Sequence, residues 1–249
     1  MDVHSYDPGI PLADLVRDTE RVVAGWDWRR GAYGHALSLP AYGDLHPYGR
    51  WAYQNFPCTG LLAGCPAFGA LFASLRCDKV SFRLLRRQPA SSYAWHTDRW
   101  KGAGVVRFQI PLVTDAAAFL VTTDYTDERQ VIGDRALTAA TFDAFAAANG
   151  GHFEKHHLAA GRLHYFDTSR VHTLVNPGPD ERITLSFDLV ANAWVRERFP
   201  HVRAELGDGP IASLPRPGRV GSALAFLQSR LHPLRGRARR WLGRDAAEE

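Results

Sequence analysis

The chain contains little sulfur, with three cysteines and one methionine in 249 residues. Cys58, Cys65 and Cys77 are odd in number and include no C-x-x-C pair, which argues against a disulfide framework or a structural zinc site. We expect them to be small buried side chains in a reducing compartment. No apolar run approaches the roughly 18 residues that a membrane-spanning helix needs. The first residues also lack a basic stretch followed by an apolar one, so we expect a cytoplasmic protein with no transmembrane segment.

The composition is that of a soluble globular protein. Hydrophobic residues make up 45% and charged residues 22%, which is enough for a core and excludes disorder. The net charge is +4, but residues 216–249 hold eight arginines against three acids, a net +5, so the other 215 residues sum to −1. A nearly neutral body argues against nucleic acid as a partner. We expect the Arg-rich tail to be a helical extension packed on the body, with an acidic partner or an anionic membrane surface as the alternative.

Hydrophobic spacing changes along the chain from helical to alternating. Residues 12–24 and 66–77 carry apolar side chains at helical spacing, which predicts two helices. After Cys77 the period becomes two, which predicts strands. The predicted strands are 80–87, 105–113, 118–123, 161–166 and 182–190, with short helices over 141–149 and 222–231 and a turn over 176–179. Helices followed by a run of strands predict an α+β, mainly β domain in which helices buttress a sandwich or barrel.

Two histidines have surroundings that indicate a metal site. In an extended segment, residues two apart point to the same face, so His96 and Asp98 place an imidazole beside a carboxylate. A surface pair is the alternative reading of this H-x-D sequence. His172 lies in a second apolar strand, and it would complete the set of two histidines and one carboxylate that is typical of non-haem Fe(II) oxygenases.

The strand that begins at Arg182 alternates strictly. Arg182, Thr184 and Ser186 face one way and the apolar residues between them face the other, as a ligand-holding barrel needs. A guanidinium beside a hydroxyl can hold a carboxylate through charge-assisted hydrogen bonds. A structural ion pair of Arg182 with Asp180 or Glu181 is the alternative.

The order H-x-D, distal histidine and Arg-x-Thr resembles the pattern of the Fe(II)/2-oxoglutarate dioxygenases. The segments QPASSYAWHTD, VVRFQIPLVTD, GRLHYFDTSRVHTLVNPG and RITLSFDLV are similar to the aspartyl/asparaginyl β-hydroxylases and related proline hydroxylases. The resemblance covers residues 80–192 and implies a catalytic core built as a double-stranded β-helix, a jelly-roll or cupin-like barrel. Residues 1–79 would form a helical and irregular buttress, and residues 193–249 a C-terminal extension with the Arg-rich helical tail.

The resemblance also implies a metal and its ligands. His96, Asp98 and His172 would bind Fe(II) and serve as the catalytic residues, with 2-oxoglutarate and O2 as co-substrates. Vertebrate-type aspartyl β-hydroxylases carry glycine where this chain has Asp98. The carboxylate therefore makes the site similar to the three-ligand majority of the superfamily and argues against halogenation.

Four residues would bind the co-substrate if the resemblance holds. Arg182, with Thr184 beside it, would bind the distal carboxylate of 2-oxoglutarate. Arg107 stands where the family has an arginine in an R-x-H stretch that also contacts the co-substrate. Gln109 replaces the histidine of that stretch, and its amide can still donate a hydrogen bond.

Candidate substrate-binding residues lie near these motifs. Arg83 and Arg87, on the first strand, and Arg170, before His172, could grip a substrate carboxylate, with surface charge as the alternative. Trp95 flanks the metal motif and would either pack or form a wall of the substrate site. The long segment 124–157 is expected to lie over the active site.

The run of His152, His156 and His157 lies within that long segment. It follows two glycines and lacks an H-E-x-x-H sequence, so it predicts a flexible polar loop, with substrate contact as the alternative.

The resemblance implies hydroxylation of an aliphatic carbon of an amino acid, as a free, peptidyl or carrier-tethered aminoacyl substrate. Decarboxylation of 2-oxoglutarate to succinate would accompany this step. Two alternatives stay open. The same site could desaturate, cyclise or otherwise oxidise another small metabolite, or the barrel could bind metal without turnover.

Overall fold

The fold is described from a computed structural model, which describes residues 2–24, 36–38, 64–98, 104–131, 137–138 and 140–206. The elements are, in chain order, β1 (His4–Tyr6), α1 (Leu12–Val23), β2 (Ala36–Ser38), α2 (Pro66–Ser74), β3 (Lys79–Arg87), β4 (Ser91–Ser92), β5 (Val105–Val113), β6 (Phe119–Thr123), the 3-10 helix η5 (Glu128–Gln130), α3 (Phe142–Ala148), β7 (Phe153–His156), β8 (Leu163–Tyr165), β9 (His172–Asn176), β10 (Arg182–Val190), α4 (Ala193–Arg198) and α5 (Pro200–Leu206). None of the helices in these ranges has the length and apolar character required to cross a bilayer. The predicted helix over 222–231 and Cys58 lie outside the described residues.

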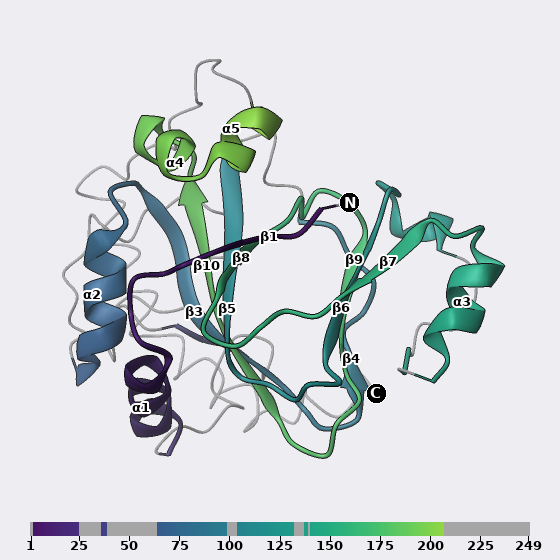
Figure 1. The fold of residues 1–249 in the computed structure, drawn as a ribbon, viewed down its shortest axis with the longest axis horizontal. Coiled ribbons are helices and arrows are strands. Elements are labelled where there is room, and N and C mark those ends of the chain that lie inside the picture. The colour runs from purple at the N-terminus through teal and green to yellow at the C-terminus, as the bar shows by residue number, and fades with distance from the viewer. Residues whose placement is uncertain are drawn as a thin grey trace, which may run out of the picture.

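The strands form two antiparallel sheets that lie opposite each other (Figure 1). The larger sheet has the order β1-β8-β5-β10-β3-β2 and the smaller one β4-β9-β6-β7. Among the described residues, no ladder of strand pairs joins the sheets into a closed barrel. From β3 to β6, and again from β7 to β10, consecutive strands alternate between the two sheets, and this arrangement fits a jelly-roll or cupin-like fold. The division of the chain at residues 79/80 and 192/193 stays a prediction.

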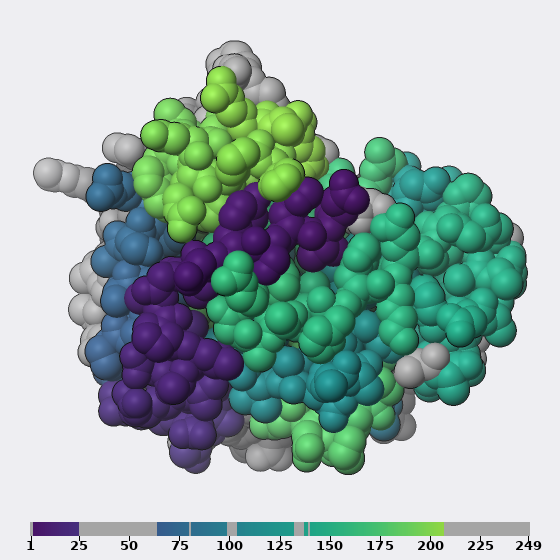
Figure 2. Space-filling model, in the orientation of Figure 1, coloured from purple at the N-terminus to yellow at the C-terminus, as the bar shows by residue number. Residues whose placement is uncertain are grey.

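Helices cover the outer face of the larger sheet. Alternate side chains of its central strands, among them Phe82, Phe108 and Phe187, are fully buried in one cluster with Leu15 of α1 and Phe68 of α2. Figure 1 places α1 and α2 beside β3, and α4 and α5 at the end of β10. In Figure 2 the N-terminal segment with β1 crosses the surface below α4 and α5. The predicted helices over 12–24, 66–77 and 141–149 and the predicted long strands are thus confirmed in position.

The second predicted helix is shorter than expected. It ends at Ser74, because Leu75 is extended (φ −78°, ψ 97°) and turns the chain towards β3. Lys79 donates from Nζ to the carbonyl oxygens of Leu75 (2.7 Å) and Cys77 (3.1 Å). Leu75 O also accepts from Cys77 N at 2.9 Å, so the turn after the helix is held by both backbone and side-chain bonds. Cys77, like Cys65, is a buried free thiol, as expected.

The smaller sheet has its own core on its outer face. Phe119 and Val175 pack there with Phe142 and Phe145 of α3. Trp95 joins this cluster, 7% exposed, with its ring stacked on Phe145 at 5.4 Å between centroids. Trp95 therefore packs in this outer core, one of the two alternatives considered, because it precedes His96 and points to the opposite face of the sheet.

The segment 124–157 is divided between two places. Its helix α3 lies on the outer face of the smaller sheet, whereas its start reaches the metal motif, where Glu128 Oε1 accepts hydrogen bonds from Thr97 N (2.9 Å) and Oγ1 (3.0 Å). The expected flexible loop around the histidines is corrected, because Phe153–His156 forms β7 along β6. His156 Nε2 lies 2.8 Å from Thr122 Oγ1 across this strand pair. The burial along β7 does not alternate, because Glu154 and Lys155 are both exposed after buried Phe153, so local spacing gave no signal for this edge strand.

Candidate metal centre

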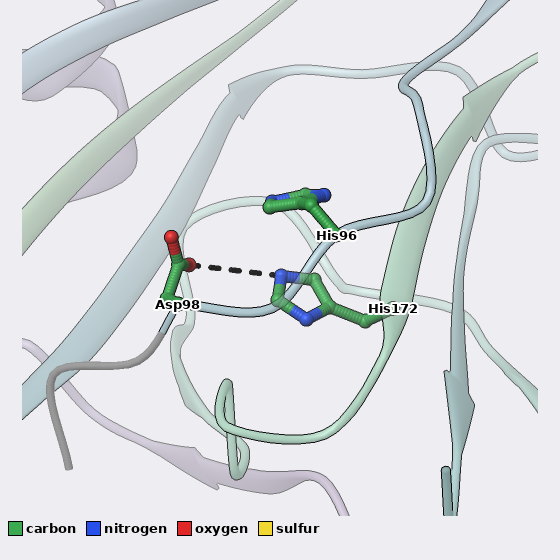
Figure 3. Close-up of side chains that lie close together, drawn as sticks. All are labelled: His96, Asp98 and His172. Carbon is green, nitrogen blue, oxygen red and sulfur yellow. Dashed lines mark ion pairs between the residues drawn. The ribbon is translucent and has the colours of Figure 1, made fainter. Parts of the chain in front are cut away.

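The structure brings His96, Asp98 and His172 together at one end of the smaller sheet (Figure 3). Two backbone hydrogen bonds join the two histidines, His96 N to His172 O (3.2 Å) and His172 N to His96 O (3.0 Å). This bridge sets the imidazoles side by side, with ring centroids 4.2 Å apart. Asp98 is fixed by its own N–H, which donates to Thr168 O at 2.7 Å. One ligand atom from each residue lies within 4.8 Å of the others, and His172 Nε2 is 3.7 Å from Asp98 Oδ2.

Both imidazoles are held in the form that a metal ligand requires. Nδ1 of His96 lies 2.9 Å from Ala94 O, and Nδ1 of His172 lies 2.9 Å from Arg170 O. A carbonyl accepts only from N–H, so the proton is assigned to Nδ1 and the lone pair to Nε2. Burial lowers the pKa of His96, and burial together with the neighbouring His96 lowers that of His172 to about 4. Both rings are therefore neutral at pH 7 and free to bind a cation through Nε2.

Asp98 is oriented by a buried charge network. Arg107 donates to Asp98 Oδ2 through Nη1, and to Asp188 through Nε (2.6 Å) and Nη2 (2.9 Å). Ser81 donates to Asp188 at 2.7 Å. Burial alone would raise the pKa of Asp188, but Arg107 holds it well below its usual range. In turn burial would lower the pKa of Arg107, and the carboxylates of Asp188 and Asp98 raise it.

This network changes the interpretation of Arg107. The resemblance implied a contact with the co-substrate, whereas the guanidinium is committed to two carboxylates, one of which belongs to the metal site. Arg107 makes these contacts because the strand register places it directly opposite Asp188 on β10. Sequence reasoning missed Asp188, although its position in the inward set of β10 is visible in the alternation.

Arg182 is a buried cation at the other end of β10. It is 2% exposed, and it donates from Nε to Thr114 Oγ1 (3.1 Å) and from Nη1 to Thr184 Oγ1 (2.7 Å). No carboxylate in the described part of the chain pairs with it, and Glu181 is instead 3.7 Å from Arg86. Burial and the charge of Arg87 lower the pKa of Arg182 to about 9. Such a cation with spare donors is suited to bind an anionic ligand.

Between these two ends, a row of polar side chains crosses the inner face of the larger sheet. Ser186 is opposite Gln109 on one side and Arg83 on the other, and Gln109 is opposite His164. Ser186 Oγ, Arg83 Nε and His164 Nδ1 are buried and have no hydrogen-bond partner among the described residues. Unpaired buried polar atoms are costly in a native interior, so this row is suited to contact a ligand.

Sequence reasoning had placed Ser186 on the inward face of its strand, but it had not singled out His164. A histidine between two apolar strand residues, as in Leu163-His164-Tyr165, is the signal that could have found it. Arg83, a candidate substrate residue, lies in this row, 3.9 Å from Asp188.

The two remaining arginine candidates have different surroundings. Arg87 lies on the inner face, with its Cζ 4.2 Å from the centre of the Tyr93 ring, and Tyr93 meets the His96 ring edge-on at 4.6 Å. Arg170 points away, donates to Asp124 O at 2.8 Å and lines a separate surface cleft of about 520 Å³. Only its backbone carbonyl touches the metal site, through His172 Nδ1.

Comparison with solved structures gives matches of low sequence identity. No protein-family model and no curated protein matches the chain. AviO1 from Streptomyces viridochromogenes Tue57 is similar at 15% identity, covering 77% of this chain and 90% of that one, with a TM-score of 0.44. HygX from Streptomyces hygroscopicus, with nickel and 2-oxoglutarate bound, is similar at 9% identity, covering 75% and 81%, with a TM-score of 0.45. SnoN, a non-heme alpha ketoglutarate dependent epimerase from nogalamycin biosynthesis, is similar at 14% identity, covering 76% and 78%, with a TM-score of 0.42.

Structural similarities with these identities and TM-scores do not show what chemistry the chain performs, so its chemistry is judged from its own residues. The resemblance to the aspartyl/asparaginyl β-hydroxylases is not shown by them and stays a prediction.

Proposed function

We propose that the chain is an Fe(II)- and 2-oxoglutarate-dependent oxygenase that hydroxylates an aliphatic carbon of an amino acid. The substrate would be free, peptidyl or tethered to a carrier as an aminoacyl group. One observation carries the proposal, namely the two neutral imidazoles and one carboxylate within 4.8 Å of one another. Three ligands of this kind on one side of an ion leave open positions for co-substrate and O2.

The residues present fit this metal. His96 and His172 offer Nε2, Asp98 offers a carboxylate oxygen, and the bonds from both Nδ1 atoms to backbone carbonyls fix the rings. When bound, Fe(II) with 2-oxoglutarate and O2 supplies the oxidation of the C–H bond, with succinate and CO2 as by-products.

The chain's own residues then have positioning roles. Arg107 holds Asp98 in place through a hydrogen bond, and Asp188 in turn holds Arg107 by accepting from its Nε. Arg182 and Thr184 would bind the distal carboxylate of 2-oxoglutarate, since their side chains adjoin each other on the inner face. Holding the target carbon near the metal would be the remaining task, because a small displacement changes the rate greatly.

The test is succinate formation by purified protein. Protein loaded with Fe(II) and 2-oxoglutarate without oxygen is exposed to O2 in the presence of amino acids or carrier-bound aminoacyl groups. We expect succinate that depends on Fe(II) and O2, and a product that has gained one oxygen atom. A product that has lost two hydrogen atoms would indicate desaturation instead. Metal-loaded protein that binds no 2-oxoglutarate and forms no succinate would contradict the proposal.

The matched control is the variant Arg86→Gln. Arg86 is on the same strand as Arg83 and Arg87 but on its opposite face, where it pairs with Glu181 at 3.7 Å. Its turnover should equal that of the unmodified protein, whereas His172→Ala should form no succinate.

A further inference from the structure

Two arginines lie opposite each other on the inner face of the larger sheet. Arg87, the last residue of β3, is the direct register partner of Arg182, the first residue of β10. Arg182 is fully enclosed, and Arg87 is partly buried. Like charges directly opposite each other on neighbouring strands are destabilising, and burial strengthens their repulsion.

Nothing in the described part of the chain neutralises this pair. Neither guanidinium is within ion-pair distance of a described carboxylate, and the polar neighbours of Arg182 are the hydroxyls of Thr114 and Thr184. Arg87 makes no hydrogen bond with a described residue and rests on the Tyr93 ring at 4.2 Å. Burial lowers the pKa of both arginines, and Arg87 lowers that of Arg182 further. The site therefore holds two positive charges that a bound anion would compensate.

We propose that Arg87 and Arg182 together form the anchor for the distal carboxylate, and that this double anchor selects dicarboxylic 2-oxo acids over monocarboxylic ones. The inference rests on the proposed function and adds to it a second residue that determines co-substrate choice. Arg87, first considered as a contact for the substrate, becomes part of the co-substrate site.

The position of Tyr93 supports this assignment. Its ring contacts the Arg87 guanidinium and also meets the His96 ring edge-on, with centroids 4.6 Å apart. Because one aromatic ring makes both contacts, the Arg87 guanidinium lies near the metal site. Stacking also holds the planar guanidinium in one orientation before the ligand arrives, which lowers the entropic cost of binding.

The experiment measures binding without turnover. Protein loaded with Ni(II), which binds the same ligand types, is titrated by calorimetry with 2-oxoglutarate and with 2-oxopentanoate, which has the same chain length and lacks the distal carboxylate. For Arg87→Met we expect the affinity for 2-oxoglutarate to fall about 10- to 100-fold, the range for losing hydrogen bonds to a charged group. Binding of 2-oxopentanoate should change by less than about twofold, since it lacks the group that the anchor holds. Arg86→Met on the opposite face should leave both affinities unchanged.

Thermal unfolding of the ligand-free protein gives a second readout. Removing one of two repelling charges should leave the Tm of Arg87→Met equal to or above that of the unmodified protein. A lower Tm together with weaker binding would mean a structural role and overturn the inference. If Arg87→Met does not fold, Arg87→Gln, which keeps a polar side chain, is used in the same titrations.

Equal losses of affinity for both 2-oxo acids in Arg87→Met, or no loss for either, would likewise overturn the inference. If 2-oxoglutarate binds and depends on Arg182 but not on Arg87, this inference alone fails. If the unmodified Ni(II) protein binds neither acid, the proposed function fails as well.

Discussion

The substitution Asp188→Asn removes one negative charge from a side chain that is 1% exposed and changes its shape little. Arg107 would lose the charged partner that accepts from its Nε at 2.6 Å and its Nη2 at 2.9 Å, since asparagine keeps one acceptor oxygen and no charge, and Asp98 would be its one remaining carboxylate partner among the described residues. Breaking a buried ion pair costs about 3–5 kcal/mol, and we take the lower end because one carboxylate remains. For a chain of this size, about 3 kcal/mol corresponds to a fall in Tm of roughly 6–12 °C.

The same substitution should weaken metal binding. With Asp188 neutral, the positive charge of Arg107 is left to Asp98 and competes with the metal for that carboxylate. Loss of a residue that supports a metal ligand typically costs about 10- to 100-fold in metal affinity. The assay combines calorimetric unfolding with Ni(II) titration. As a control, Asp180→Asn removes an exposed carboxylate and should change stability by less than about 0.5 kcal/mol. An Asp188→Asn protein with unchanged Tm and unchanged Ni(II) affinity would refute the role assigned to this network.

Three further outcomes are expected. His172→Ala should reduce Ni(II) affinity by at least about 100-fold while the fold persists, checked by titration and circular dichroism, and an unchanged affinity would remove this residue from the site. Arg107 holds the pKa of Asp188 below its ordinary 3.8. The stabilisation that ionised Asp188 gives the folded protein is therefore present above pH 3.8 and is lost as the pH falls further. The acid unfolding curve of Asp188→Asn should accordingly be flatter than that of the unmodified protein. Phe187→Ala on the outer face should cost about 3–5 kcal/mol in urea unfolding, whereas Ser186→Ala on the inner face should leave stability nearly unchanged and alter 2-oxo acid affinity. Similar unfolding curves for these two variants would contradict the assigned faces.

The sequence could predict the strands of the larger sheet because their alternation is strong. From Arg182 to Leu189 the apolar residues of β10 pack on the helices and the polar ones face inward, so both the element and its orientation follow from the period. His96, Asp98 and His172 could be grouped because the spacing of the first two fixes a shared face and the third lies in an apolar strand.

The partners across the sheet could not be predicted in the same way. The contact of Arg107 with Asp188, and that of Arg87 with Arg182, depend on which strands pair and in which register. Local spacing carries no information on either. The edge strand β7 was missed for a related reason, because its short polar sequence forms a strand only where β6 offers a free edge.

The reciprocal backbone bonds between His96 and His172 form an isolated bridge at the start of β9, so the two imidazole positions depend on each other. Separation of these two chain segments would disassemble both imidazole positions in one event, so an intermediate with only one of them in place should be sparsely populated. Metal binding would then be cooperative with the pairing of these two segments, and a bound ion would slow hydrogen exchange at both histidine amides together.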